Sequence, residues 1–210
     1  SEQNVFLSKK DKKNQFSASQ TAMMRQIWDI QKNESAKSFP TTGERKLIAI
    51  LIGFTDKAFT KTQADFNALF NQVGYTTGGA TGSVKDYYLE NSYNQFNLTV
   101  DIAGPYTASN TMAYYGANDA SGYDVKPREL VTEAVQLANP AVNYADYDND
   151  TDGSVDAVYI IYAGYGEEAS GPANAIWAHA WNISGITLDG KTISRYSCSA
   201  ELRGNSGTNL

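Results

Sequence analysis

The sequence has only one cysteine and one histidine among its 210 residues. A single cysteine excludes an intrachain disulfide and a cysteine-based zinc cluster. A single histidine rules out a zinc site built on a histidine pair from these residues alone. No apolar run approaches the roughly 18 residues that a transmembrane helix needs. Basic residues are also few, since 17 Lys and Arg stand against 23 Asp and Glu, which argues against nucleic-acid binding.

The composition that remains is that of a globular protein with material for a core, because 41% of the residues are hydrophobic and 12% are aromatic. Only 19% are charged, and Tyr, Asn, Gly and Thr are abundant, which favours an exported protein. The first residues, "SEQNVFLSKKDKK", lack the apolar core of a signal peptide. We therefore expect a secreted or cell-surface protein whose signal peptide is not in this chain.

The chain divides into two parts of different character. Residues 1–40 are polar, and one amphipathic helix is expected over residues 19–33, with Met23, Met24, Ile27 and Trp28 on one face. "SFPTTGER" then indicates a linker or turn. We expect residues 1–40 to be the end of a propeptide or a linker, and residues 41–210 to form a domain.

Strands and helices alternate in this second part. "KLIAILIGF" at 46–54 and "VDAVYIIYAG" at 155–164 are apolar runs typical of strands buried on both faces. Helical patterns follow Thr62, Ser83 and Lys126, and Asp65 and Asp86 stand where capping boxes require an acceptor. Further strands are expected at 95–104, 175–181 and 192–199, with "LDGK" as a hairpin turn. The fold class is therefore α/β (α+β), a layered domain with a mixed, mostly buried sheet.

One short loop, "DYDNDTDGSVD", holds five aspartates in eleven residues. Such crowding is unfavourable unless something neutralises the charges. The spacing D-x-D-x-D-G-x-x-D matches the first nine positions of an EF-hand type calcium loop, in which alternate oxygens face one ion. The predicted calcium ligands are Asp148, Asp150, Asp152, Ser154 and Asp156.

The match to a calcium loop is incomplete, because position 12 is Tyr159 and not the bidentate glutamate. This indicates a structural calcium loop between a helix and a strand, and not a helix–loop–helix sensor. A solvated Asp/Asn-rich turn is the alternative. Glu167 or Glu168 is considered as a further ligand, with no preference for or against.

Catalytic groups are sparse. A Ser-His-Asp triad would have to use His179, but no G-x-S-x-G motif is present. Cys198 and His179 could form a cysteine-protease dyad, yet both flanks are strand-like and offer no helix N-terminus to acidify the thiol. A pair of carboxylates for glycoside hydrolysis is not singled out. His179 lies between Trp177 and Trp181, which favours a packed core residue over a catalyst.

Several segments together resemble the immune inhibitor A-like family of secreted bacterial zinc metallopeptidases, which belong to the zincin class. They are "FPTTGERKLIAILIGFTDKAF", "GATGSVKDYYLENSYNQFNLTVDIAGPY", "DYDNDTDGSVDAVYIIYAGYGEE", "AIWAHAW" and "YSCSAELRGNSGTNL", which span about residues 39–210. The resemblance implies a zincin-like domain, a structural calcium at the aspartate loop, and protein or peptide substrates. In that family an H-E-x-x-H helix supplies zinc ligands and the general base further along the chain.

No residue of the present sequence corresponds to those zinc ligands. The resemblance therefore implies the N-terminal part of a catalytic domain that is inactive alone and needs a C-terminal half. "TISRYSCS" at 192–199 is predicted as the edge strand that pairs with substrate. The rival hypothesis is a non-catalytic, calcium-stabilised extracellular binding module, whose aromatic loop "MAYYGAND" would contact glycans or protein.

Overall fold

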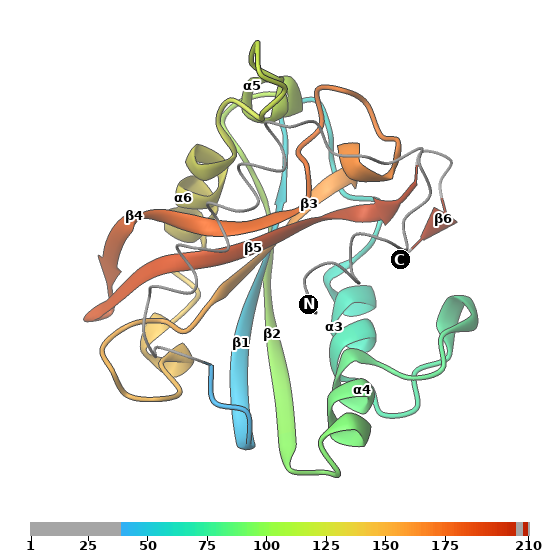
Figure 1. Cartoon of the computed structure of the whole chain (residues 1–210), viewed down its shortest axis with the longest axis vertical. Helices are drawn as coiled ribbons and strands as arrows, with labels where there is room; N and C mark the ends of the chain where they lie inside the picture. The colour runs from blue at the N-terminus through green and yellow to red at the C-terminus, as the bar shows by residue number, and fades with distance from the viewer. Residues whose placement is uncertain (1–38, 205–207, 210) are drawn as a thin grey trace, which may run out of the picture. The chain divides into compact units, whose positions relative to one another are not determined.

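The computed structural model describes residues 39–204, together with residues 208 and 209. The helix expected at 19–33 lies outside the described residues. The described part is a sheet with helices on both faces (Figure 1). The strands are β1 (Gly43–Gly53), β2 (Phe96–Thr107), β3 (Val158–Tyr165), β4 (His179–Leu188), β5 (Lys191–Arg203) and β6 (Thr208–Asn209). The helices are α3 (Gln63–Asn71), α4 (Val84–Asn91), α5 (Met112–Gly116) and α6 (Pro127–Ala138), and short 3-10 turns cover Thr77–Gly79, Tyr144–Tyr147 and Glu167–Ala169.

The sheet has the order β2-β1-β3-β5-β4, with β6 paired to β5. Strands β2, β1, β3 and β5 run parallel to one another, whereas β4 and β6 are antiparallel to β5. The α/β class and the mixed sheet expected from the sequence are thus confirmed. The predicted substrate edge at 192–199 is wrong, because that segment lies in β5, between β3 and β4. The antiparallel edge strand is β4.

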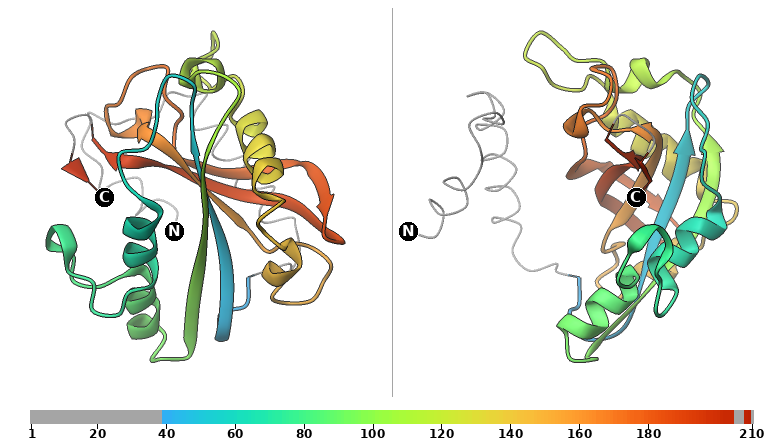
Figure 2. Two further views of the ribbon diagram at one scale, coloured as in Figure 1. Left: turned by 180° about the vertical axis from the view of Figure 1, so that it is seen from behind. Right: turned by 90° about the vertical axis from the view of Figure 1, so that its right-hand side faces the viewer.

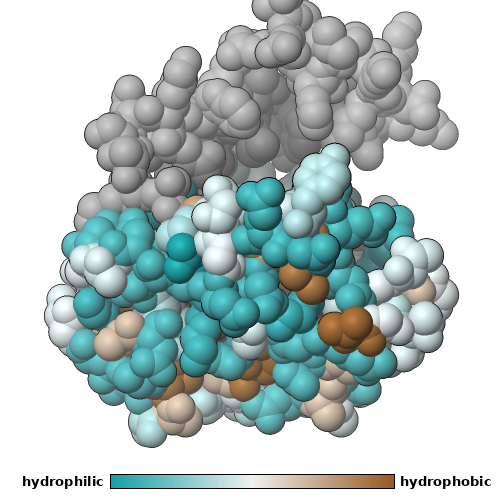
Figure 3. Space-filling view, turned by 90° about the horizontal axis from the view of Figure 1, so that it is seen from below, coloured by the Kyte–Doolittle hydropathy of each residue, from teal (hydrophilic) through white to brown (hydrophobic). Residues whose placement is uncertain are grey.

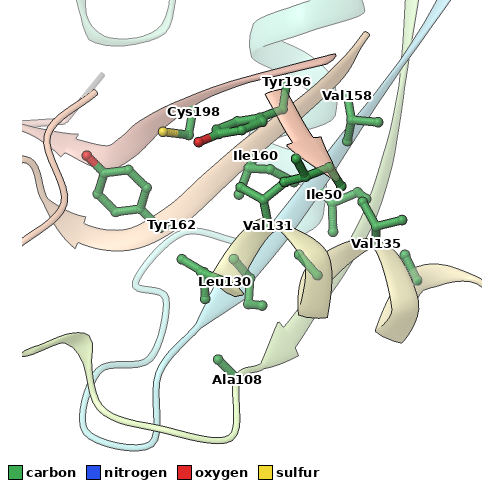
Figure 4. Close-up of a cluster of buried hydrophobic side chains, with 14 of the residues drawn as sticks. Ile50, Ala108, Leu130, Val131, Val135, Val158, Ile160, Tyr162, Tyr196 and Cys198 are labelled. Atoms are coloured by element: carbon green, nitrogen blue, oxygen red, sulfur yellow. The ribbon is translucent and has the colours of Figure 1, made fainter. Parts of the chain in front are cut away.

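The central strand β1 is buried on both faces, as its apolar run predicts. Ile48, Ile50 and Ile52 pack on one face with α6, and Ala49 and Leu51 pack on the other with the phenylalanines of α3. Figure 4 shows the first of these clusters, in which Leu130, Val131 and Val135 of α6 lie against the sheet. The view from behind in Figure 2 shows α6 on its own face of the sheet, away from α3 and α4.

Local sequence signals set most of the element ends. Thr62 with Asp65, and Ser83 with Asp86, form the predicted capping boxes of α3 and α4. The hairpin between β4 and β5 turns at Asp189 and Gly190, whose φ angles of 51° and 74° suit the two-residue connection that an Asp-Gly pair favours. One expected strand is shorter than predicted: residues 175–178 are not strand, and β4 begins at His179.

Candidate metal loop and neighbouring polar clusters

The aspartate loop connects the 3-10 turn Tyr144–Tyr147 to the amino end of β3. In open α/β sheets, substrates and cofactors bind beyond the carboxyl ends of the parallel strands. The loop lies at the opposite end, which suits a structural role better than a catalytic one. Glu167 and Glu168 follow β3, so a strand of eight residues, roughly 25 Å long, separates them from the loop and excludes them as its ligands.

Three of the predicted ligands come together. Asp148, Asp150 and Asp152 each offer a carboxylate oxygen, and these three oxygens all lie within 4.8 Å of one another. Gly153 has a φ of 91°, a conformation that suits the sharp turn required at the sixth position of such a loop. The donor set is hard oxygen alone, which suits calcium better than zinc.

Asp148 is the buried member of the group and is already bonded by the protein. Its two carboxylate oxygens accept hydrogen bonds from the backbone N–H groups of Asp152 and Gly153, both at 3.0 Å. Lys191 donates from Nζ to Oδ2 at 2.7 Å. Burial alone would raise the pKa of Asp148, but these donors outweigh it and hold the pKa below its usual value. The repulsion in the loop is therefore partly relieved without any added ion.

The remaining two predicted ligands have other contacts. Asp156 accepts hydrogen bonds at Oδ2 from the backbone N and the side-chain Nδ2 of Asn149, at 2.7 and 2.9 Å. Burial raises the pKa of Asp156, and the nearby carboxylates add to the rise. The N–H of Ser154 donates to Oδ1 of Asp152 at 2.8 Å, and Ser154 forms a parallel bridge with Thr192. The role of Asp156 and Ser154 as ligands stays a prediction.

Asn149 joins the loop to the sheet, a contact that sequence reasoning missed. Its side-chain amide accepts from the backbone N of Lys46 and donates to the backbone O of the same residue, both at 2.9 Å. Since β3 pairs with β1 only from Ile48 onward, this amide continues the pairing as a neighbouring strand would. No pattern in the sequence singles out one asparagine of an Asp/Asn-rich turn for this task.

His179 and Cys198 are adjacent, as a dyad would require, but their chemistry is wrong for one. They face each other across β4 and β5, with Sγ 3.4 Å from Nδ1. Nδ1 also lies 2.6 Å from the carbonyl O of Trp177, so it must carry the proton, and Nε2 lies 2.7 Å from the hydroxyl of Tyr196. Burial raises the pKa of Cys198 to about 12 and lowers the pKa of His179. Nδ1 therefore donates and cannot take the thiol proton, and the pair is a packed core contact.

A second group of carboxylates surrounds the start of β4, and sequence reasoning did not find it. Asp124 accepts from the backbone N of Trp177 at 2.9 Å, and Glu168 accepts from the backbone N of Ala178 at 3.0 Å. Glu167 accepts from Asn118 at 3.0 Å. Burial raises the pKa of Asp124 to about 7, and the charges of Glu167 and Glu168 contribute. These carboxylates hold the segment that leads into the edge strand.

Glu201 is a fully buried carboxylate near the carboxyl end of β5, and sequence reasoning did not find it either. Its Oε1 accepts from the backbone N of Thr60 at 2.6 Å, the Thr60 hydroxyl at 2.8 Å and the backbone N of Lys61 at 2.7 Å, and its Oε2 accepts from the backbone N of Gly164 at 3.0 Å. Four donors thus stabilise the charge. The sequence signal that could have revealed it is an acidic residue between the apolar residues Ala200 and Leu202 near the end of a strand.

The aromatic loop of the rival hypothesis is not an exposed platform. Residues 112–116 form α5, Tyr115 is fully buried, and Tyr114 donates its hydroxyl to Glu129 at 2.8 Å. The exposed tyrosines lie elsewhere, with Tyr87 at 62% and Tyr93 at 86% exposure. The face shown in Figure 3 is largely hydrophilic, with only separate hydrophobic groups among its described residues. The two tyrosines of "MAYYGAND" are thus held by contacts within the chain, and a binding role for this segment stays a prediction.

The mixed sheet with an antiparallel edge strand, covered by helices on both faces, defines a layered α/β domain of the kind found in peptidases. The family model described as "Immune inhibitor A peptidase M6, catalytic domain" matches residues 34–200, and the chain belongs to this family. It is 35% identical over 177 residues to the pre-pro-metalloprotease PrtV of Vibrio cholerae, covering 66% of this chain and 19% of the relative. It is 31% identical over 127 residues to immune inhibitor A of Bacillus thuringiensis, covering 50% of this chain and 18% of the relative.

These matches confirm the resemblance inferred from the sequence. The chain carries peptidase-domain sequence of a metallopeptidase family, and it spans about a fifth of the length of the curated relatives it matches. Among the described residues, none of the helices has the length and apolar character needed to cross a membrane.

Proposed function

We propose that this chain supplies part of the catalytic domain of a secreted, zinc-dependent endopeptidase. The family match over residues 34–200 is the observation that carries the proposal. The parallel strands and the antiparallel edge strand β4 support it, because a sheet of this kind can present an extended peptide along one edge. Protein or peptide substrates follow from the same assignment.

Zinc in this class polarises the peptide carbonyl and activates a water molecule. The 210 residues contain one histidine, and both of its ring nitrogens are engaged inside the core. Among the described residues, the carboxylates close enough to hold one metal ion are those of Asp148, Asp150 and Asp152, which offer oxygen donors and lie at the end of the sheet opposite to the usual catalytic end. We therefore propose that the zinc ligands come from other sequence of the complete protein, and that the 210 residues alone do not hydrolyse peptides.

The test compares the complete protein with the 210-residue chain. We expect the complete protein to contain tightly bound zinc by elemental analysis and to cleave casein in a reaction that a chelator abolishes and zinc restores. We expect neither property in the 210-residue chain. A complete protein that binds no zinc, or whose proteolysis survives removal of the metal, would contradict the assignment.

The edge strand β4 is proposed to hold the substrate, in place of the segment expected from the sequence. Its inner side pairs with β5 from His179 to Leu188, and no strand of the described residues pairs with its outer side. A peptide added there would run as a further strand, with backbone hydrogen bonds giving affinity and alternate side chains giving selectivity. In the complete protein, an inhibitory peptide should protect the outer amides of β4 from hydrogen exchange, and unchanged protection would exclude this placement.

The aspartate loop is proposed to hold a structural calcium ion. Support comes from the convergence of Asp148, Asp150 and Asp152, and from the conformation of Gly153. The ion would relieve the repulsion that the protein's own donors leave at Asp150 and Asp152, which are exposed. Calcium would thereby fix the amino end of β3, a central strand of the sheet.

Calcium binding is tested by calorimetric titration of the 210-residue chain and by thermal unfolding with calcium or magnesium. We expect calcium to bind and to raise the unfolding temperature more than magnesium does. Asp150→Asn should weaken binding, whereas Asp119→Asn, in a different acidic loop, should not. Absence of calcium binding would remove the structural ion from the proposal and leave the peptidase assignment untouched.

A further inference from the structure

The sheet has two edge strands among the described residues, β2 and β4. They differ in whether side chains form hydrogen bonds with the backbone groups on their outer sides. An edge strand presents unpaired N–H and C=O groups, which can pair with a strand of another molecule. β2 is long, with 12 residues, and four of its residues are buried. Such a strand is a template for self-association unless its edge is covered.

Several outer backbone groups of β2 are bonded by side chains from α3 and from the end of α4. Asn71, at the end of α3, donates from Nδ2 to the backbone O of Val100 at 2.8 Å and accepts at Oδ1 from the backbone N of Val100 at 2.9 Å. The carboxamide of Asn71 therefore makes the two hydrogen bonds that a peptide group of an adjacent strand would make.

Two further side chains act on the same side of β2. Gln63, at the start of α3, donates from Nε2 to the backbone O of Ile102 at 2.5 Å. The hydroxyl of Ser92, after α4, accepts from the backbone N of Phe96 at 3.0 Å. Phe96, Val100 and Ile102 are an even number of residues apart, so their peptide groups point to one side of the strand. The other side of β2 pairs with β1.

We propose that Asn71, Gln63 and Ser92 seal the outer edge of β2 and prevent a second copy of this chain from adding a strand there. The seal leaves β4 as the edge strand of the described sheet whose outer side no described strand pairs with. The inference does not depend on the peptidase assignment, since it follows from the hydrogen bonds of α3, α4 and β2 alone. Asn71 is the central element, because it satisfies both a donor and an acceptor of the strand.

The test replaces Asn71 with leucine, which has a similar size but forms no hydrogen bond. In the 210-residue chain, Asn71→Leu should speed hydrogen exchange of the Val100 amide about tenfold or more. It should also cause self-association that grows with protein concentration, measured by light scattering after size-exclusion chromatography. At high concentration, protection of the Val100 amide should return as the second copy covers it.

The matched control is Asn91→Leu at the end of α4, because the amide of Asn91 donates to the carbonyl of Tyr87 in its own helix and, among the described residues, forms no hydrogen bond with β2. This variant should stay as monomeric as the unmodified chain. Faster exchange at Val100 without self-association would overturn the proposal, because the helices alone would then block the edge. Unchanged exchange would overturn it as well. If Asn71→Leu does not fold, Gln63→Leu removes the donor to the carbonyl of Ile102. This variant should self-associate in the same light-scattering assay, and a variant that stays monomeric would overturn the proposal.

Discussion

The ammonium group of Lys191 lies 2.7 Å from a carboxylate oxygen of Asp148, whose side chain is 1% exposed. The two residues are 43 positions apart. The turn between β4 and β5 brings Lys191 to the aspartate loop, and backbone bonds between Gly153, Val155 and Thr192 hold the two segments together. A cation of the chain itself is thus placed where a divalent ion is proposed to act.

Replacing Lys191 with methionine is expected to destabilise the chain in the absence of calcium by about 2 kcal/mol, because Asp148 would lose its charged partner while still buried. Calcium should then restore much of the lost stability, since the ion can take over the role of the ammonium group. Chemical denaturation with and without calcium measures both effects. Lys46→Met is the control, because its pair with Asp101 is half exposed and contributes little. Equal losses in the two variants would contradict the prediction.

Asp124→Asn is expected to change how stability depends on pH. The pKa of Asp124 is raised to about 7 by burial and by Glu167 and Glu168, so the folded state favours the protonated form. The unmodified chain should therefore lose stability as pH rises from about 4 through 7. The variant cannot ionise and lacks this loss. The free energy of unfolding of the variant should equal that of the unmodified chain at pH 4 and exceed it by on the order of 2 kcal/mol at pH 8. Urea denaturation across this range measures it, and parallel profiles would refute the explanation.

Cys198 is expected to be unreactive in the folded chain. Burial raises the pKa of its thiol to about 12, and His179 directs its Nδ1 proton toward a carbonyl. A thiol reagent at pH 8 should label the native chain at least a hundredfold more slowly than the unfolded chain, since labelling requires the core to open (roughly 3 kcal/mol or more). Cys198→Ala should leave proteolysis by the complete protein intact. Loss of activity with an unchanged fold would revive the cysteine-dyad hypothesis.

Glu201→Gln is expected to destabilise the chain by about 2 kcal/mol, because an amide can accept at one oxygen only and would direct N–H groups at backbone donors. The loop that contains Thr60 and Lys61 should exchange its amides faster. Thermal unfolding and hydrogen exchange measure the two effects. Glu44→Gln is a control on the exposed start of β1, where Asn97 donates one hydrogen bond to the carboxylate. A neutral result at Glu201 would mean that the four donors do not need its charge.

The sequence predicted the elements whose signals are local. The apolar run of β1, the capping residues Thr62 and Ser83, and the Asp-Gly turn before Lys191 each act within a few residues, and each has the expected result. The strand order was a different problem. Nothing in "TISRYSCS" shows that β4 pairs with the second side of this segment and so removes it from the edge of the sheet. Periodicity within a strand does not reveal which strands become its neighbours.

The candidate site was predicted in outline and not in its contacts. The period-two spacing of Asp148, Asp150 and Asp152 gave their convergence, because alternate positions of a tight loop face one point. Lys191 and the pairing of Asn149 with Lys46 were not predictable, since both contacts join segments more than forty residues apart. The carboxylate of Glu201 escaped notice for the same reason.

The two-residue connection at Asp189 and Gly190 also limits how this protein can change its length. Side chains alternate across a strand, so one inserted residue at this turn would rotate Lys191 to the opposite face of β5 and remove its ammonium group from Asp148. The same insertion would move Asp189 away from the backbone N–H of Tyr144, which now donates a hydrogen bond to the Asp189 carboxylate at 2.8 Å. Length variation among related chains should therefore avoid this connection.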